Sequence, residues 1–337
     1  MNIYLDNKFL NMKEIIDTPF PFIFVVGARG IGKTYGSLLE MIEKKEKFIL
    51  LRTSDVECQL CTTEESNPFK SINRDYHTNI HIKKINKFMY GIYKDEEQEY
   101  RGLVMALTTF YKARGMDFSD VKYILYDEFI AQTEQKKING IGEALMQAYE
   151  TISRNRELLG EKPLKCICLA NALNINNEVL IQFGIVSILS KMKKQGIDYK
   201  EDQERGILVI CPKFSPISVM KANTVLYKVN KRFNEMALDN QFREYYDKNV
   251  ISRNMRNFKL IVGYDRMFFY KDLSTGDTYV SSYKMSGFKV DHYSNTDFER
   301  KKFTQQYYFY VTRYYNDRIK FESPELELEF INLYNLK

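Results

Sequence analysis

The chain has 337 residues, a length that suggests one large domain or two modest ones. Its apolar share of 44% and charged share of 28% are typical of globular proteins and exclude a largely disordered chain. The formal net charge of +6 permits contact with nucleic acid without requiring it. Residues 1–12 carry no signal pattern, and no apolar run reaches the roughly 20 residues that span a bilayer. We therefore expect a protein of the cytoplasm that makes no membrane contact.

The first half of the chain predicts strands that alternate with helices. The apolar run 21–26 ends at Gly27 as a buried strand ends, residues 33–45 have a helical apolar stripe, and a second apolar run follows at 48–52. Such a strand–helix–strand unit predicts a right-handed crossover between parallel strands. Further strands are predicted at 80–85, 88–93, 103–107, 121–126 and 164–169, and a helix at 143–159. This alternation predicts an α/β fold with a parallel sheet.

The sequence pattern changes after about residue 187. Residues 191–205 are charged and poorly periodic, which predicts an exposed linker, and residues 233–246 predict a helix. Beyond residue 249 the alternating stretches 259–262 and 267–270 predict strands, whereas 305–315 and 324–336 suit either helices or strands. We expect a first domain over residues 1–190, a linker or lid region over 191–248, and a smaller β-rich second domain over 249–337.

The five cysteines fit no disulfide framework in a chain of this length. Cys58 and Cys61 form a CxxC pair, and two histidines follow it within the next twenty residues. A zinc site, which needs about four ligands, is one interpretation, and two ordinary thiols near a strand end are the other.

The segment 27–34 matches the phosphate-binding motif G-x-x-x-x-G-K-[ST] at every fixed position. The glycines let the backbone wrap around phosphates, and the following helix points its positive end at them. Lys33 would place a positive charge beside the β- and γ-phosphates, and Thr34 would offer its hydroxyl to Mg²⁺. The alternative is an ordinary glycine-rich turn. The predicted nucleotide contacts are Gly27, Ala28, Arg29, Gly30, Ile31, Gly32, Lys33 and Thr34.

Two acids follow the apolar run 123–126, which places them at the carboxyl edge of the sheet beside the P-loop. Asp127 is suited to hold Mg²⁺ through water, and Glu128 is suited to orient and polarise an attacking water. A base for water favours a hydrolase, so we predict an ATPase that uses ATP and Mg²⁺. A P-loop kinase for a small molecule and a nucleotide-binding assembly protein without turnover are the alternatives.

Further polar residues are candidates for the same site. Asn171 ends the apolar run 164–170, where it would sense the γ-phosphate or simply form a turn. Arg154 or Arg156 would act as an arginine finger on a neighbouring subunit's ATP, or would only balance a helix C-terminus. Arg52, at the end of the second strand, is a further candidate near the phosphates.

Five segments, in their order and spacing, match one family across roughly residues 20–245. They are residues 26–35, 126–130, 154–157, 166–172 and 235–242. The P-loop is common to many ATPases, whereas Arg-Asn-Arg-Glu, Cys-Ile-Cys-Leu and Asp-Asn-Gln-Phe are more specific. With these segments the chain resembles the genome-packaging ATPase of small short-tailed phages with protein-primed linear genomes.

The resemblance implies a homopentameric ring that translocates double-stranded DNA through the portal into an empty prohead. The ATPase domain would be of the terminase-like, additional-strand (ASCE) P-loop class. The position of Arg154 would act in trans, and those of Arg52 and Arg114 would handle nucleotide or DNA. The protein would work in the host cytoplasm and transiently on the portal vertex.

The resemblance further implies a second domain similar to a vestigial RNase H-like nuclease that docks to the portal or to packaging RNA. Asp265, Asp272 and Asp277 show no spacing suited to a two-metal site, so we expect no nuclease activity. The aromatic and basic segment 307–318 would face nucleic acid, or would form core with a solvated face. Candidate nucleic-acid contacts are Lys112, Arg114, Lys191, Lys193, Lys194, Arg253, Arg256, Lys259, Arg300, Lys301 and Lys302.

Overall fold

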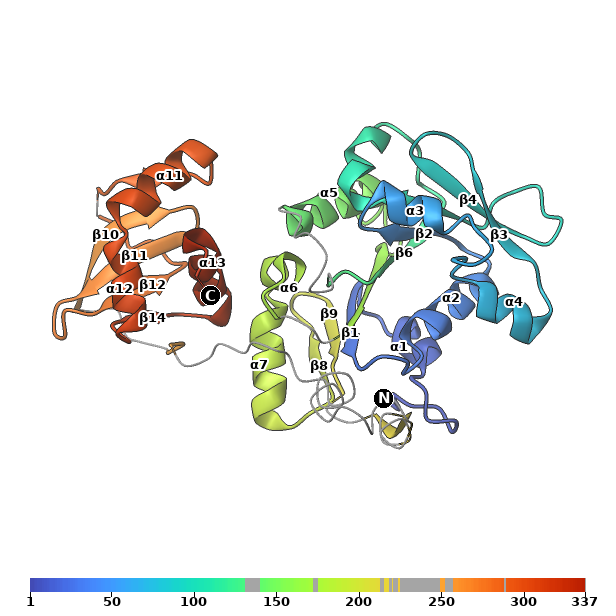
Figure 1. The fold of residues 1–337 in the computed structure, drawn as a ribbon, viewed down its shortest axis with the longest axis horizontal. Helices are drawn as coiled ribbons and strands as arrows, with labels where there is room; N and C mark the ends of the chain where they lie inside the picture. The colour runs from blue at the N-terminus through green and yellow to red at the C-terminus, as the bar shows by residue number, and fades with distance from the viewer. Residues whose placement is uncertain are drawn as a thin grey trace. The chain divides into compact units, whose positions relative to one another are not determined.

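The computed structural model describes residues 1–130, 140–171, 175–212, 215–217, 220, 224, 249–251, 257–287 and 289–336. The chain divides into two compact units, Met1–Arg243 and Glu244–Lys337 (Figure 1). Over the described residues, no helix combines the length and the apolar character needed to cross a membrane. The helix predicted at 233–246 lies outside the described residues.

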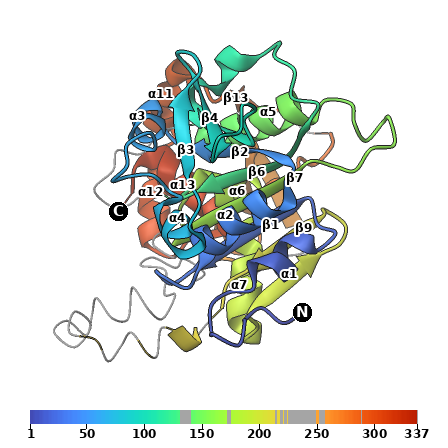
Figure 2. The same ribbon diagram turned by 90° about the vertical axis from the view of Figure 1, so that its right-hand side faces the viewer.

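The first unit is built on a large sheet. Its strands, as far as the chain is described, are β1 (Phe22–Gly27), β2 (Lys47–Arg52), β3 (Ile80–Lys84), β4 (Met89–Lys94), β5 (Gly102–Ala106), β6 (Val121–Asp127), β7 (Lys165–Asn171), β8 (Tyr199–Asp202) and β9 (Ile207–Ile210). Their order is β3-β4-β5-β2-β6-β7-β1-β9-β8, and Figure 2 shows β6, β7 and β1 side by side within it. The strands from β5 to β9 in this order are parallel, whereas β3, β4 and β8 join the edges antiparallel. The predicted parallel α/β sheet is confirmed.

Helices cover both faces of this sheet because the strands are apolar on both sides. One face packs against α1 (Met12–Asp17), α2 (Lys33–Lys44), α3 (Asp55–Leu60) and α4 (Lys70–Tyr76). The other helices are the 3₁₀ helix η1 (Leu107–Ala113), α5 (Ile141–Ser153), α6 (Glu178–Gln182) and α7 (Ile185–Gln195). Strand β1 shows the alternation, since Ile23 lies in the cluster with Leu38 of α2, while the Phe22 ring lies 4.6 Å from that of Tyr149 on α5.

The predicted linker over 191–248 is wrong in its first part. Residues up to 195 continue helix α7, and β8 and β9 extend the sheet, with Phe22 of β1 opposite Ile207 of β9. The first unit therefore continues at least to residue 210. The charges misled the prediction because they lie on the exposed side of α7, on the edge strand β8 and in the turns beside it, while Leu189 and Met192 are buried.

The second unit contains a smaller sheet with the order β13-β10-β11-β12-β14. Its described elements are β10 (Phe258–Tyr264), β11 (Met267–Asp272), β12 (Thr278–Ser281), β13 (His292–Tyr293), β14 (Ile319–Phe321), α11 (Asp297–Gln306), α12 (Phe309–Tyr315) and α13 (Pro324–Tyr334). The β10–β11 and β11–β12 pairs are antiparallel, and the two short outer strands are parallel to their neighbours. The segments 305–315 and 324–336, for which the sequence allowed helix or strand, are mostly helical. The likeness of this unit to RNase H stays a prediction.

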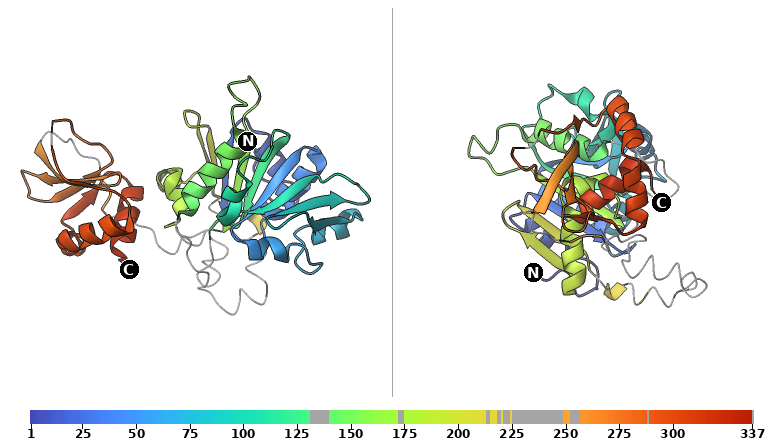
Figure 3. Two further views of the ribbon diagram at one scale, coloured as in Figure 1. Left: turned by 90° about the horizontal axis from the view of Figure 1, so that it is seen from above. Right: turned by 90° about the vertical axis from the view of Figure 1, so that its left-hand side faces the viewer.

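Aromatic residues form most of the core of the second unit. The left view of Figure 3 shows the red helices on one side of the orange strands, and Phe269, Phe303 and Phe330 are fully buried between them. The aromatic segment 307–315 divides between core and surface, because Tyr310 is buried and Tyr308 is 63% exposed. This division matches the expectation of a core with a solvated face.

Candidate nucleotide site

The site lies where four parallel strands end. In the registers of the sheet Gly27 is opposite Asn171, and Asp127 is opposite Leu169, so β7 separates β1 from β6. Because parallel strands end at the same edge, the P-loop and the ends of β2, β6 and β7 converge there. Crevices at the carboxyl ends of parallel strands are where open α/β sheets bind their ligands.

The P-loop connects β1 directly to α2. Gly32 is the N-cap of α2 with a φ of +93°, a left-handed conformation that glycine adopts without strain. No side chain caps this helix, so its first amide N–H groups are available to an anion. A Cβ atom at Gly27 would lie 2.6 Å from Cδ1 of Ile31, so the terminal methyl group of Ile31 would have to shift to admit one.

A cavity of about 320 Å³ opens at this edge, which is within the range of small-molecule sites. Its lining consists of Arg29, Gly30, Gly32, Lys33, Thr34, Tyr35, Asp127, Glu128, Ala170 and Asn171. The structure thus brings together most of the residues singled out from the sequence. Tyr35 and Ala170 had not been singled out, although each is adjacent in sequence to a residue that had been.

Lys33 is only 7% exposed and its ammonium group is held by oxygen acceptors. Its Nζ donates to the carbonyls of Gly27 at 3.0 Å and Ala28 at 2.8 Å, and to Oδ1 of Asn171 at 3.1 Å. Asn171 therefore lies beside the P-loop lysine, as its strand-end position suggested. An ammonium group held by neutral oxygens can exchange them for the oxygens of a phosphate.

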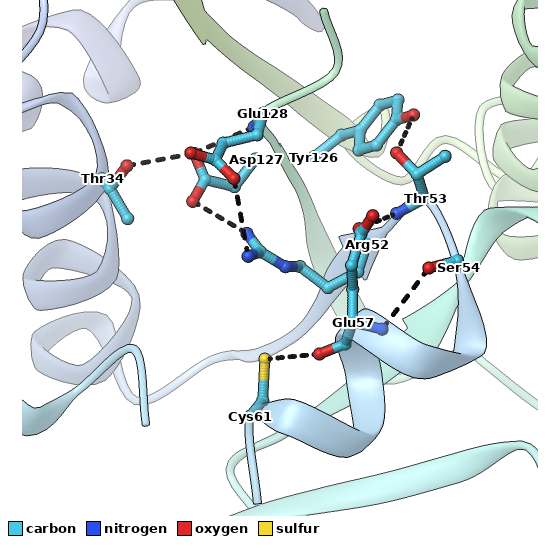
Figure 4. A network of polar contacts seen from close by, with 9 residues as sticks. All are labelled: Thr34, Arg52, Thr53, Ser54, Glu57, Cys61, Tyr126, Asp127 and Glu128. Atoms are coloured by element: carbon cyan, nitrogen blue, oxygen red, sulfur yellow. Dashed lines mark hydrogen bonds and ion pairs between the residues drawn. The ribbon is translucent and has the colours of Figure 1, made fainter. Parts of the chain in front are cut away.

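The hydroxyl of Thr34 donates to Oδ1 of Asp127 at 3.0 Å (Figure 4). Asp127 is 6% exposed, and this burial raises the pKa of its carboxyl group despite the attraction of Arg52. A hydroxyl and a carboxylate together are the hard oxygen donors that Mg²⁺ prefers. The chemistry of this pair therefore fits a magnesium site.

Arg52 is the last residue of β2, and its guanidinium group lies beside both acids. Its Nη1 donates to Oδ2 of Asp127 at 3.1 Å, and its Nη2 lies 3.8 Å from Oε2 of Glu128 (Figure 4). The sequence had placed Arg52 near the phosphates, and the structure pairs it with the carboxylates. One guanidinium group therefore offsets the repulsion between two adjacent acids.

Glu128 has a backbone conformation that is rare for a residue with a side chain. Its φ is +56°, and its N–H donates to Oδ1 of Asp127 at 3.1 Å. Such a conformation costs on the order of 1 kcal/mol or more and is often found at functional sites. It turns the chain out of β6, so that the half-exposed Glu128 side chain contributes to the cavity.

Residues beyond Arg52 hold this corner in place. The Thr53 N–H donates to Oε2 of Glu57 at 3.0 Å, and the Thr53 hydroxyl lies 3.1 Å from the hydroxyl of Tyr126. The first contact joins the end of β2 to α3, and the second joins it to β6 (Figure 4). Sequence analysis did not identify the contact with Tyr126, because the two residues are 73 positions apart in the chain.

The CxxC pair lies near Arg52 and Glu57, as Figure 4 shows for Cys61. Cys58 and Cys61 are buried at α3, where the Cys61 thiol donates to the carbonyl of Glu57 at 3.2 Å. Burial raises the pKa of both thiols. Within the described ranges, no group of three or more His, Cys, Asp or Glu side chains is placed to hold a metal ion. The zinc interpretation therefore has no support there.

Arg154 and Arg156 differ sharply despite their proximity in sequence. Arg156 is 5% exposed and donates to the carbonyls of Ile152, Ser153 and Val121 at 3.1, 3.3 and 2.9 Å. Arg154 has a φ of +48°, which ends α5 six residues earlier than predicted, and its side chain is half exposed beside the Met116 carbonyl. Neither arginine lines the cavity, and only Arg154 is accessible to another molecule.

The N-terminal segment supports the P-loop from outside. Tyr4 and Leu10 form an antiparallel bridge, and the N–H of Leu10 donates to the carbonyl of Ile31 at 2.9 Å. The Phe9 side chain lies 3.2 Å from the position that a Cβ atom would take at Gly32. The sequence had shown only that this segment is not a signal, so its contact with the P-loop is a new observation.

The candidate nucleic-acid contacts are scattered over the described chain. Arg114 donates to Oε1 of Gln147 at 2.9 Å, and Arg300 donates to the carbonyl of Asn332 at 2.8 Å. Arg253 and Arg256 lie outside the described residues. The exposed ones are Lys112, Arg114, Lys191, Lys193, Lys194, Lys259, Lys301 and Lys302.

The strand order and the site define a class of protein. A P-loop after β1, an acidic end on β6 and one additional strand between them are the features of an additional-strand P-loop NTPase. The family model of the podovirus DNA encapsidation protein (Gp16) matches residues 4–317, and the chain belongs to this family. The family resemblance inferred from the sequence is confirmed.

Individual relatives agree with this assignment. The DNA packaging proteins of Bacillus phages B103 and phi29 are each 26% identical to this chain over 245 and 246 residues, or 71% of its length. The matched stretches span 69% and 65% of those two proteins.

Two solved structures share the fold. The Phi-28 gp11 DNA packaging motor has a TM-score of 0.66 at 20% identity and covers 98% of this chain and 99% of its own. The bacteriophage Phi-29 viral genome packaging motor assembly has a TM-score of 0.60 at 16% identity, with 97% and 99% covered.

Proposed function

We propose that this chain is the ATPase subunit of a ring-shaped motor that drives double-stranded viral DNA into a preformed prohead. The observation that supports this most is the convergence of Lys33, Thr34, Asp127 and Glu128 on one cavity, in a member of a DNA encapsidation family. The relatives and structural neighbours carry the names of DNA packaging proteins and motors.

The P-loop residues would bind the phosphates of ATP. Backbone N–H groups at the uncapped start of α2 would point at phosphate oxygens. The ammonium group of Lys33 would replace its hydrogen bond to Asn171 with contacts to the β- and γ-phosphates. Thr34 and Asp127 would hold Mg²⁺ at the position where they now contact each other. Bound Mg²⁺ would neutralise charge on the phosphates.

Glu128 would orient the attacking water and accept its proton. Its strained backbone directs the carboxylate to the rim of the cavity, beyond the buried Asp127. A kinase must keep water away from the γ-phosphate, so a carboxylate in this place favours hydrolysis. Asn171, which touches the Lys33 ammonium group, would sense whether a γ-phosphate is present.

The site would be completed by a neighbouring subunit. Arg154 is accessible at the end of α5 and would act in trans on the ATP of the next subunit, as the family resemblance implies. Head-to-tail contacts of this kind close into a ring, for which we propose five copies. The ring would work in the host cytoplasm, docked transiently to the portal of the prohead or to a packaging RNA.

The test is the rate of ATP hydrolysis with and without double-stranded DNA and proheads. Replacing Glu128 by Gln should lower the stimulated rate by about 10²–10⁴-fold while nucleotide binding persists, because general-base catalysis contributes about that much. The matched control is Glu204→Gln, which removes an exposed acid between β8 and β9 and should leave the rate unchanged. A Glu128→Gln protein that hydrolyses ATP like the wild type would contradict the assigned role.

The same assay separates the alternatives. A phosphorylated small-molecule product would identify a kinase. Nucleotide binding by the wild type with no turnover in the presence of proheads and DNA would identify an assembly protein that does not hydrolyse ATP.

A further inference from the structure

The β3–β4 hairpin carries a feature that the nucleotide site does not use. Strand β4 is antiparallel to both β5 and β3, so β3 runs in the same direction as β5 and β2. The end of β3 at Lys84 therefore lies at the same edge of the sheet as Arg52. The turn of the hairpin, residues 85–88, projects from this edge.

Lysines and aromatic rings interleave at this turn and on the adjacent helix η1. Nζ of Lys112 lies 4.5 Å from the ring centroid of Phe88 and 5.6 Å from that of Tyr111, and Nζ of Lys87 lies 5.7 Å from Phe88. Cation–π contacts of this kind connect the hairpin to η1. We define the basic tip as Lys83, Lys84, Lys87, Phe88, Tyr111 and Lys112.

The basic tip is exposed and carries no compensating acid. Its four lysines are exposed, and Tyr111 is 59% exposed. Among the ion pairs of the described residues, none involves any of these lysines. Lys83 and Lys84 face opposite sides of β3, where their Nζ atoms lie 5.8 Å from the ring centroid of Tyr93 and 6.0 Å from that of Tyr90. With Lys87 and Lys112 they place positive charge on both sides of this edge, which suits a polyanion.

Hydrogen bonds connect the basic tip to the corner that holds Arg52. The N–H of Thr108 on η1 donates to the carbonyl of Thr53 at 3.3 Å, and the Thr109 hydroxyl donates to Oδ1 of Asp55 at 2.9 Å. Thr53 follows Arg52 directly in the chain. Helix η1 is thus fixed between an exposed basic surface and the strand end that pairs with Asp127 and Glu128.

We propose that the basic tip binds the phosphate backbone of double-stranded DNA. Its lysines suit contact with phosphates without reading sequence, which a protein that moves along any DNA requires. The proposal rests on the proposed function, since it makes the basic tip a contact between the motor and its cargo. DNA held there would lie at the same edge as the nucleotide and would act on η1, which contacts the Arg52 corner.

The experiment compares two triple variants of the full chain. Lys83→Gln/Lys84→Gln/Lys87→Gln removes three charges from the basic tip. Lys13→Gln/Lys45→Gln/Lys162→Gln removes three exposed charges elsewhere, and Lys45 and Lys162 precede β2 and β7 at the opposite edge of the sheet. Fluorescence anisotropy with a DNA duplex of mixed sequence, repeated over a range of salt concentrations, gives the affinity and its salt dependence.

The basic-tip variant should bind the duplex at least tenfold more weakly at low salt. The slope of log affinity against log salt should fall by about 2–3, because each lost phosphate contact accounts for about 0.9. Its ATPase rate without DNA should match the wild type, while stimulation by DNA should be lost. The control variant should resemble the wild type in all of these measurements.

Several results would overturn the proposal. Equal affinity and slope in the basic-tip variant and the wild type would exclude this surface, and equal losses in both variants would reduce the effect to net charge. Weaker binding of an RNA duplex with unchanged DNA binding would assign the surface to RNA. A wild-type protein that hydrolyses ATP but is neither bound nor stimulated by DNA overturns the basic tip and leaves the ATPase assignment in place.

Discussion

The two units of the molecule use acidic residues in different ways. In the first unit, Asp127 and Glu128 end a parallel strand, and both line a cavity. In the second unit, Asp272 accepts the N–H groups of Ser274 and Thr275 at 2.8 and 3.3 Å, and Asp277 pairs with Arg318 at 3.0 Å. In the turns of antiparallel hairpins, acidic side chains accept hydrogen bonds from neighbouring backbone N–H groups. At the ends of parallel strands, acidic side chains instead face a crevice. The absence of nuclease activity from the second unit stays a prediction, which an assay with Mg²⁺ and DNA can test.

The largest expected effect is a loss of ATP hydrolysis, and it should distinguish a lysine of the first unit from a lysine of the second. Lys33 donates to Asn171 in the first unit, and Lys320 donates to Oδ1 of Asn249 at 2.8 Å in the second. Replacing Lys33 by Ala should lower ATP hydrolysis by more than about 100-fold, because a charge at the transferred phosphate is lost. Lys320→Ala should leave ATP hydrolysis unchanged, and steady-state ATPase assays measure the rates of both variants. A Lys33→Ala protein with wild-type turnover would contradict the P-loop assignment.

The two arginines that follow α5 should differ in their contribution to the stability of the first unit. Arg156→Ala should lower the free energy of unfolding by about 2–4 kcal/mol, because it leaves three buried carbonyls without their charged donor. Arg154→Ala removes a half-exposed side chain and should change stability by no more than about 0.5 kcal/mol. Chemical denaturation measures both values.

The activity of the same variants tests the trans role of Arg154. Assembled motors that contain Arg154→Ala should bind ATP and fail to hydrolyse it. Full activity in a motor built from this variant alone would exclude the role, and a greater loss of stability for Arg154→Ala than for Arg156→Ala would contradict the structural assignment.

Glu327 provides the corresponding test in the second unit. It is 1% exposed, and its Oε1 accepts from Asn249 at 3.2 Å and from the Tyr314 hydroxyl at 3.1 Å. Replacing it by Ala should destabilise the second unit by about 1–3 kcal/mol, because buried donors lose their acceptor. Thermal denaturation measures this loss, and the ATPase rate without DNA should not change. A large loss of that rate would show that the acid serves the site and not only its own unit.

Replacing Glu40 should produce the smallest effect, a change of melting temperature whose direction follows from the pKa of Glu40. Burial, together with repulsion from Glu43, raises the pKa of Glu40 above its ordinary value of 4.5. The folded state therefore holds this proton to higher pH than the unfolded state does. The contribution of Glu40 to stability is most favourable below pH 4.5 and is lost as the pH rises through the folded pKa.

At pH 7 the variant Glu40→Gln should therefore melt about 1–3 °C higher than the wild type, and the gain should shrink near pH 4. Glu65→Gln, which changes an exposed acid between α3 and α4 that does not act on Glu40, is the control and should show neither effect. A lower melting temperature for Glu40→Gln at pH 7 would show that the ionised carboxylate is stabilising.

The local pattern of the sequence determined the fold class, the P-loop and the acidic strand end. These features depend on neighbouring residues, since the loop needs glycines at fixed positions and a buried parallel strand needs an unbroken apolar run. Lys33, Thr34, Asp127 and Glu128 were identified for this reason, and the family followed from segments around them.

Tertiary structure decided which distant residues meet. Nothing in the chain order places β7 between β1 and β6, adds β9 to β1, or sets Arg52 against Asp127. Arg154 and Arg156 have the same side chain, yet packing leaves the first half exposed and buries the second against three carbonyls. The contact of Phe9 with Gly32 and the gathering of the basic tip likewise depend on packing. Local sequence fixes backbone geometry, but the partner of a side chain depends on which strands become neighbours.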